Sequence, residues 1–257
     1  MIGFYVFCLG LIVGSFLNVV IFRLNTGESV VKGRSRCLAC GAELKWFELI
    51  PVLSFLFQAG RCRTCQSKIS RQYPIMELAA ALIFYALYLK WLAVWPLNIS
   101  VFMWWLIFWS VFLALAVYDF YHKILPDILV YLLGVLAVLG GAIFFKKDFW
   151  LALAIGALFF LFFAGLWLVS KGKWMGLGDA KLFFSVGVFF GWPLALAAMF
   201  FSFWFGAIIS GIIAFFKRSL NLKSEVPFGP FIFLGAITAF FWGDFVFSWY
   251  LKIIFNV

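Results

Sequence analysis

Long apolar runs recur along almost the whole chain, and they restrict what it can fold into. Most of them approach the roughly 20 residues that carry a helix across the hydrocarbon core of a bilayer. Of the 257 residues, 67% are hydrophobic and 12% charged, whereas a soluble domain is about half apolar and a quarter charged. We therefore predict an all-α polytopic membrane protein in the lipid bilayer, with about eight transmembrane helices. The expected crossings are Ile2–Phe22, Pro74–Trp95, Val101–Tyr118, Ile128–Phe145, Phe149–Val169, Ala180–Gly191, Pro193–Phe216 and Phe228–Phe247.

The sixth run, Ala180–Gly191, is short for a crossing. Gly191-Trp192-Pro193 supplies a turn after it. If this run only dipped into the membrane and returned, the basic loop of residues 217–223 would lie outside. That would break the bias of lysine and arginine towards cytoplasmic loops, so we interpret the run as a short full crossing.

Basic residues set the orientation. With the N-terminus outside, 16 of the 20 lysines and arginines fall on the cytoplasmic side, as the positive-inside rule expects. The net charge of +10 thus reflects topology, and we expect no nucleic-acid partner. We divide the chain into a first transmembrane helix (1–22), a cytoplasmic loop (23–73) and a transmembrane core (74–257). The four lysines outside are Lys90, Lys146, Lys147 and Lys252.

The polar loop carries two C-x-x-C pairs, Cys37 with Cys40 and Cys62 with Cys65. Two such pairs, 21 residues apart, have the spacing of a tetrahedral zinc site. With four thiolates bound, no position is open for catalysis, so the zinc would be structural. Two disulfides are disfavoured in a cytoplasmic loop, and a redox centre would need one pair on a thioredoxin-like βαβ pattern, which is absent.

Two acids stand at the edges of apolar runs. Tyr118-Asp119 ends one, and Gly176-Leu177-Gly178-Asp179 opens another. A carboxylate at the edge of a membrane helix is costly and therefore rarely incidental. If the two edges meet, Asp119 and Asp179 would share one proton and activate a water molecule. That is the arrangement an intramembrane aspartic protease needs.

The chain resembles the bacterial type IV prepilin peptidases, because it carries six sequence motifs in the order in which they occur in that family. The resemblance implies cleavage of prepilin or pseudopilin leaders by Asp119 and Asp179 on the cytoplasmic side of the bacterial inner membrane. It also implies methylation of the new N-terminus with S-adenosylmethionine, for which the sequence shows no donor site. The motifs are Gly14-Ser-Phe-Leu-Asn-Val-Val-Ile21 with Arg23, the four-cysteine loop, Ile69 to Glu77, Leu125-Pro126-Asp127, Gly176 to Lys181, and Pro227-Phe-Gly-Pro230.

The two glycines of the Gly176 string and Glu77 can each be interpreted in two ways. Gly176 and Gly178 allow close backbone approach by a substrate, or they pack helices as small residues do in membranes. Lys181 completes the same string as a supporting residue. Glu77 either pairs with Arg71 or another loop base as a clamp, or contacts a cationic cofactor or peptide.

Asp127 follows Pro126, which places it at a helix start as a capping residue rather than a catalytic one. Proline also disfavours one continuous helix through Asp119 and Asp127.

Two other functions fit part of the pattern. A presenilin-like protease of ordinary membrane proteins shares the Tyr-Asp and Gly-x-Gly-Asp signatures, but it does not account for the cysteine loop or for Pro227-Phe-Gly-Pro230. A transporter could use Asp119 and Asp179 as proton or cation sites. Many transporters carry inverted repeats with broken helices, and we find no such duplication here.

Overall fold

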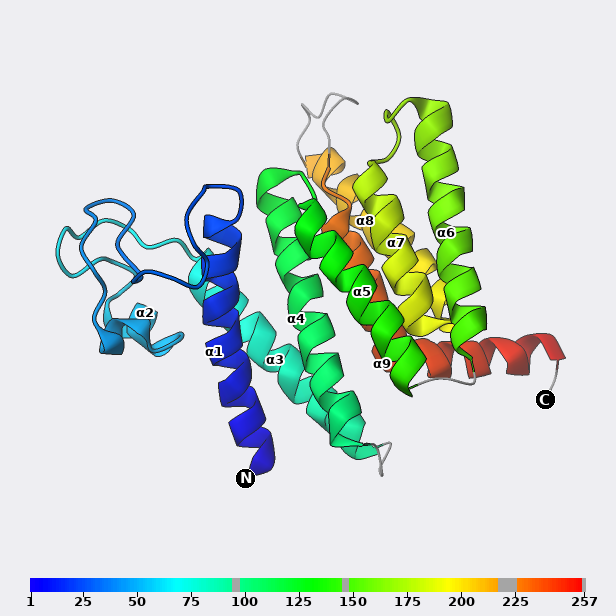
Figure 1. Ribbon diagram of the computed structural model, residues 1–257, viewed down its shortest axis with the longest axis horizontal. Helices are drawn as coiled ribbons and strands as arrows, with labels where there is room; N and C mark the ends of the chain where they lie inside the picture. The colour runs from blue at the N-terminus through cyan, green and yellow to red at the C-terminus, as the bar shows by residue number, and fades with distance from the viewer. Residues whose placement is uncertain (94–97, 145–147, 217–225, 256–257) are drawn as a thin grey trace. The chain divides into compact units, whose positions relative to one another are not determined.

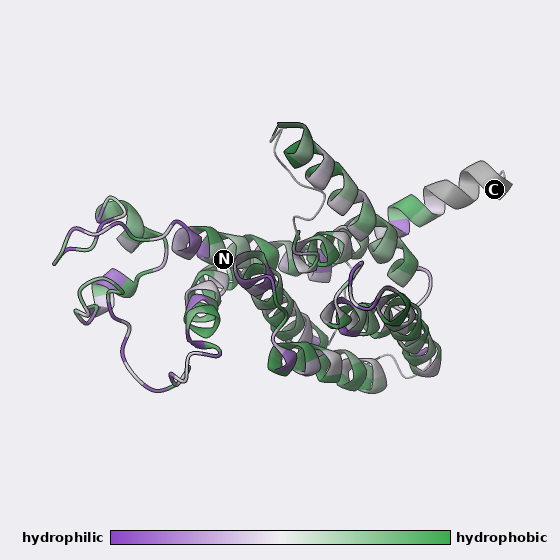
Figure 2. Ribbon diagram, turned by 90° about the horizontal axis from the view of Figure 1, so that it is seen from above, coloured by the Kyte–Doolittle hydropathy of each residue, from purple (hydrophilic) through white to green (hydrophobic). Residues whose placement is uncertain are grey.

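The structure is a computed structural model that describes residues 1–93, 98–144, 148–216 and 226–255, with side chains to Ser248. Its regular secondary structure, within those residues, is helical apart from two isolated β-bridges (Figure 1). Figure 2 shows that the long helices are mostly hydrophobic along their length. The side chains of Lys146, Lys147, Lys217, Arg218, Lys223 and Lys252, which entered the orientation argument, lie outside the described residues.

Seven of the described helices are long and apolar enough to cross a membrane, which confirms the prediction of a polytopic all-α protein. Their bounds agree with six of the expected crossings to within a few residues, and the last helix is longer than expected. These helices are α1 (Ile2–Arg23), α3 (Gln72–Ala93), α4 (Ile99–His122), α5 (Asp127–Phe144), α6 (Phe149–Ser170), α8 (Leu194–Phe216) and α9 (Gly229–Phe255).

The chain forms two compact units, Met1–Ser110 and Val111–Val257. In the first, α1 packs against α3 through two glycines one turn apart. A Cβ on Gly10 would lie 2.5 Å from the Cα of Ala81, and one on Gly14 would lie 2.6 Å from the Cα of Glu77. Since backbone atoms cannot rotate away, only glycine permits this approach. This is the small-residue packing typical of membrane helices.

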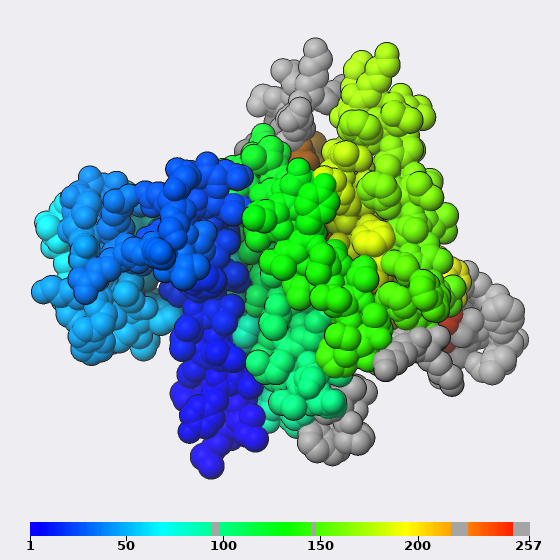
Figure 3. Space-filling view, in the orientation of Figure 1, coloured from blue at the N-terminus to red at the C-terminus, as the bar shows by residue number. Residues whose placement is uncertain are grey.

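The polar loop between α1 and α3 contains a 3₁₀ turn, η1 (Trp46–Leu49), and the short helix α2 (Leu53–Phe57). It folds back beside the end of α1 and the start of α3 (Figure 1), and Figure 3 shows its atoms gathered beside α1. Arg23 organises its first part, because its guanidinium donates hydrogen bonds to the carbonyls of Ser29, Lys32 and Arg34 at 2.9 to 3.2 Å.

In the second unit, α7 (Leu177–Phe190) packs against α5, α6, α8 and α9. Gly187 of α7 meets Gly156 of α6 so closely that a Cβ on Gly187 would lie 2.6 Å from the Cα of Gly156. Gly235 of α9 similarly approaches Ser202 of α8. The unit is thus held together by close helix contacts at small residues.

The run predicted as a short crossing, Ala180–Gly191, corresponds to α7. Its 14 residues extend about 21 Å, less than the roughly 30 Å of hydrocarbon, and α7 is not among the seven candidate spans. Because neighbouring helices surround it, α7 does not itself need to match the bilayer thickness. The turn after it lies where the sequence indicated, since α8 begins at Leu194.

Candidate functional site

The two run-edge acids lie in the same structural unit. Asp119 occupies the last turn of α4, and Asp179 the first turn of α7. Both are buried, with 5% and 8% of their surfaces exposed, and their carboxylates are close enough to interact electrostatically. Buried carboxylates are rare in proteins unless they are paired or functional. The structure therefore brings together the two acids that the sequence singled out.

A backbone amide fixes Asp119. The N–H of Gly229, the first residue of α9, donates a hydrogen bond of 2.8 Å to Oδ2 of Asp119. A Cβ at position 229 would lie 2.7 Å from the same oxygen, so only glycine lets the amide approach this far. The preceding Phe228 packs against Phe203 of α8, with ring centroids 5.2 Å apart, and against Phe183 of α7 at 6.2 Å.

Asp179 is held in a similar way. Its Oδ2 accepts a hydrogen bond of 3.2 Å from the N–H of Gly176, the N-cap of α7. Acidic residues are favoured in the first turn, where backbone N–H groups lack partners. Each acid thus accepts one backbone hydrogen bond and keeps an oxygen for other partners.

The remaining residues of the Gly176 string have structural contacts. A Cβ on Gly178 would lie 3.0 Å from side-chain atoms of Leu125, so this glycine packs against the connection between α4 and α5. Lys181 donates to Asp127 Oδ1 at 2.5 Å and to the Tyr131 hydroxyl at 3.0 Å. These contacts account for both positions by packing and pairing; a substrate role for Gly178 and an active-site role for Lys181 stay predictions.

Asp127 begins α5, and α4 ends at His122, so Asp119 and Asp127 belong to different helices as Pro126 indicated. The Asp127 side chain is well exposed and forms an ion pair with Lys181. It therefore differs from Asp119 in both burial and partner.

The four cysteines converge in the loop. All four sulfur atoms lie within 4.8 Å of one another, and Cys37 Sγ and Cys65 Sγ are 3.8 Å apart. Tetrahedral zinc with Zn–S bonds of about 2.3 Å would set sulfur atoms about 3.8 Å apart. The cysteines are free thiols rather than disulfides. This cluster could hold a metal ion.

Two equivalent backbone turns present these thiols. The backbone carbonyl of Cys37 accepts a hydrogen bond from the N–H of Gly41, and the backbone carbonyl of Cys62 accepts one from that of Gln66, each at 2.9 Å. Gly41 and Gln66 both have positive φ. Backbone N–H groups of Cys40 and Ala39 lower the pKa of the Cys37 thiol to about 6, which favours the thiolate that a metal binds. At Cys40 the backbone of Ala42 acts to lower the pKa, but hydrogen bonds with the thiols of Cys65 and Cys37 raise it to about 11.

Glu77 lies on the sixth position of α3 and is 6% exposed. Its Oε2 accepts a hydrogen bond of 2.7 Å from the N–H of Val52. Arg71 is exposed, and no ion pair joins it or any other described base to Glu77. The clamp by Arg71 is therefore absent from the described residues, and a contact with a cationic ligand stays a prediction.

Sequence reasoning missed Gly229. The Pro227-Phe-Gly-Pro230 string is recognisable as a motif, but the contact of Gly229 with Asp119 joins residues 110 positions apart. The sequence feature that could have indicated this contact is a glycine between a bulky residue and a proline at the start of a helix. Glycine often occupies such a position because the backbone comes close to another group there.

Two family models match the chain. The bacterial peptidase A24 N-terminal domain matches residues 8–91, and the type IV leader peptidase family matches residues 101–211. The second range contains both Asp119 and Asp179.

Curated relatives match over nearly the full length. A prepilin leader peptidase/N-methyltransferase of Bacillus subtilis (strain 168) is 36% identical over 96% of this chain and 96% of its own. A protein of the same name from Pseudomonas aeruginosa is 31% identical over 95% of this chain and 91% of its own. No solved structure matches the chain.

Proposed function

Because this chain belongs to the type IV leader peptidase family, we propose that it removes the leader peptide of prepilins or pilin-like proteins and then methylates the new N-terminus. The observation that carries the peptidase half is the pair of buried acids. Asp119 and Asp179 lie in one structural unit, interact with each other, and fall within the range matched by the peptidase model.

In this mechanism the two carboxylates share one proton, since close acids in a poorly solvated site do not readily both ionise. The ionised carboxylate takes a proton from water as the water attacks the scissile carbonyl. The protonated one donates a hydrogen bond to the developing oxyanion, and a proton then passes to the leaving amine. The N–H groups of Gly229 and Gly176 orient the carboxylates.

The four-cysteine cluster is proposed to bind zinc. The donor set fits this metal, because four thiolates close a tetrahedral structural site. Cys37, Cys40, Cys62 and Cys65 would hold it and join the two turns of the loop. The loop of residues 23–73 then folds as a metal-stabilised module, and residues 74–257 carry the peptidase acids.

Methylation requires a methyl donor, and S-adenosylmethionine is the proposed one. It supplies an electrophilic methyl group on a positively charged sulfur. The support for this second activity is the shared name of the relatives, since their names pair leader peptidase with N-methyltransferase.

The chain is a multi-pass membrane protein, and we place it in the bacterial inner membrane with its N-terminus outside and its catalytic face cytoplasmic. The distribution of lysine and arginine supports this orientation. The cleaved substrates would be prepilins or pseudopilins, which reach the active site from the cytoplasm.

The test is co-expression with a prepilin encoded near the gene, followed by mass measurement of the pilin. Wild type should remove the leader and add one methyl group. Asp119→Asn and Asp179→Asn, present in the membrane at wild-type level, should each leave the prepilin uncut. Full cleavage by either variant would refute the aspartic mechanism. Cleavage without methylation would refute only the second activity.

A further inference from the structure

A patch of large apolar side chains lies on the outside of the polar loop, where η1 packs against α2. Trp46 is 78% exposed and Phe57 is 82% exposed. Soluble surfaces rarely carry large contiguous apolar patches, because each Å² of apolar surface left in water costs about 25 cal/mol. The patch therefore indicates an apolar partner. Its members are Trp46, Ile50, Leu53, Leu56 and Phe57.

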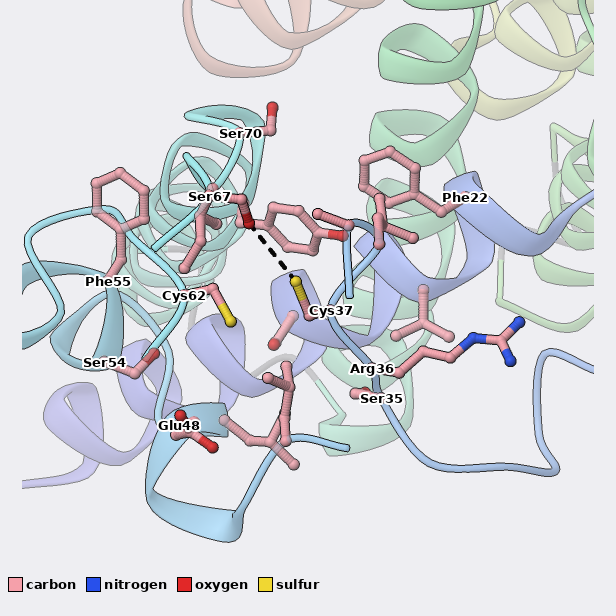
Figure 4. Close-up of a pocket in the computed structure, with 18 of the residues that line it drawn as sticks. Phe22, Ser35, Arg36, Cys37, Glu48, Ser54, Phe55, Cys62, Ser67 and Ser70 are labelled. Atoms are coloured by element: carbon pink, nitrogen blue, oxygen red, sulfur yellow. Dashed lines mark hydrogen bonds between the residues drawn. The ribbon is translucent and has the colours of Figure 1, made fainter. Parts of the chain in front are cut away.

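The short helix α2 has two different faces. Ser54 and Phe55 line a cavity of about 550 Å³ that lies between α1, the loop and the start of α3 (Figure 4). Leu53, Leu56 and Phe57 follow the i, i+3, i+4 spacing of a single helix face, and all three are exposed. One face of α2 thus packs on the protein, whereas the described part of the chain leaves the other face uncovered.

The position of α2 along the membrane helices indicates what the partner is. The N–H of Val52, the residue before α2, donates a hydrogen bond of 2.7 Å to Glu77, and the Ser15 hydroxyl of α1 bonds to the same carboxylate. Ser15 lies eight residues before the end of α1 at Arg23, which is about 12 Å of helix. Figure 1 accordingly shows α2 level with the middle of α1 rather than beyond its end. Since α1 and α3 are candidate spans, and interfacial helices lie about 5–10 Å deep, α2 lies at bilayer depth.

The charges beside the patch suit the surface of a membrane. Lys45 directly precedes the patch, and Arg61 and Arg63 follow α2. Glu48, the one acid between Lys45 and Arg63, lies on the cavity wall instead. Tryptophan with flanking lysine and arginine is typical of segments at the membrane interface, where basic side chains reach lipid phosphates. The outer face therefore combines an apolar surface with positive charge only.

We propose that residues 46–57 form an interfacial wedge in the leaflet where α1 ends and α3 begins. The patch lies among the acyl chains, and the flanking basic residues contact lipid phosphates. Lipid is favoured over a protein partner because Ile12 and Phe16 of α1, at a similar height, are exposed as well, so lipid already reaches this depth. The wedge then holds the loop to the membrane at a third point besides α1 and α3, and the loop cannot swing away from the surface.

The test measures the depth of position 57 in the full-length protein, reconstituted in vesicles of phosphatidylethanolamine and phosphatidylglycerol. A ketone-bearing phenylalanine analogue in place of Phe57 takes a nitroxide label and leaves the cysteines unmodified. Electron paramagnetic resonance then compares collisions of the label with oxygen, which concentrates among acyl chains, and with a nickel chelate, which stays in water. We expect oxygen collisions to dominate at position 57.

Two matched positions calibrate this ratio. Phe16 is exposed on the candidate span α1, and Glu43 is exposed on the same loop outside the patch. The label at position 57 should resemble the label at position 16. A ratio like that at position 43 would place the patch in water, and few collisions with either reagent would show that protein covers it; both results would overturn the proposal. Nickel access that disappears only when a prepilin is added would assign the patch to the substrate and would also overturn it.

The lipid charge tests the basic flanks separately. In vesicles of phosphatidylcholine alone, the label at position 57 should lie shallower, so that nickel collisions increase. The triple variant Lys45→Gln, Arg61→Gln, Arg63→Gln keeps the apolar patch and should reproduce this shift in the charged vesicles. A symmetric gel-filtration peak before reconstitution checks that each labelled protein is folded. An unchanged ratio in both experiments would overturn the contact of the three basic residues with lipid phosphates.

Discussion

The backbone N–H of Gly229 lies 2.8 Å from Oδ2 of Asp119, and the position leaves no room for a side chain. Gly229 begins α9, and Asp119 lies in the last turn of α4. The contact therefore ties the start of one helix to the carboxylate at the end of another. It explains why a glycine stands between Phe228 and Pro230.

Gly229→Ala is expected to reduce prepilin cleavage about tenfold or more. The new Cβ would lie 2.7 Å from Asp119 Oδ2, so the carboxylate or the backbone must move, and a hydrogen bond to a charged group is worth about 1.5–3 kcal/mol. The measurement is the rate of leader removal in membranes with matched enzyme levels. Gly165→Ala is the control, because a Cβ there meets nothing within 4 Å. Equal rates for the two variants would contradict the positioning role.

Asp119→Asn and Asp127→Asn should differ sharply, although the two acids are eight residues apart. Asp119 is buried beside Asp179, whereas Asp127 starts α5, is exposed and pairs with Lys181. Asparagine at 127 keeps an oxygen that can accept from Lys181. We expect Asp119→Asn to abolish cleavage and Asp127→Asn to retain a substantial fraction. The reverse order, at equal membrane levels, would show that Asp119 is wrongly assigned.

The sequence predicted the acids and the cysteines because their signals are local. An acid at the edge of an apolar run and a C-x-x-C spacing are both visible within a few residues. The Gly229 contact and the cavity are not, since each needs segments that are distant in sequence to meet. Glu77, for example, meets Val52 from 25 positions away.

The surroundings of α7 show another property that the sequence does not reveal, namely whether an apolar run faces lipid or protein. Hydropathy treats each apolar run as facing lipid, although the short crossing of Ala180–Gly191 itself stays a prediction. The structure gives a 14-residue helix in which Leu182, Phe183 and Val186 are fully buried. Apolar character can reflect burial within the protein as well as lipid contact, and single-sequence patterns do not separate the two.

The close contact of glycines between α6 and α7 should contribute to the stability of the folded protein. At Gly187 a Cβ would lie 2.6 Å from the Cα of Gly156, and backbone atoms cannot move without separating α6 from α7. We expect Gly187→Ala to cost about 1–3 kcal/mol, which lowers the melting temperature in detergent by several degrees.

Gly165→Ala in α6 is again the matched control. Since the site is open, the higher helix propensity of alanine should leave stability unchanged or slightly higher. A Gly187→Ala variant as stable as Gly165→Ala would show that α6 and α7 are not held by this contact.

Metal binding by the loop gives the last prediction. If the four sulfur atoms hold one zinc, purified reduced protein should contain about one metal per chain. Cys62→Ser should lose it, because Cys62 is the most buried of the four thiols. The loop folds around its two turns with only short helical segments, so metal loss should expose residues 23–73 to protease.

The control is Cys8→Ser, which removes a thiol of α1 that lies outside the cluster. This variant should keep both the metal and the resistance to protease. Elemental analysis and limited proteolysis measure both. Metal-free wild type with a protease-resistant loop would contradict the site, whereas cleavage of prepilin should partly survive Cys62→Ser because Asp119 and Asp179 lie in the other unit.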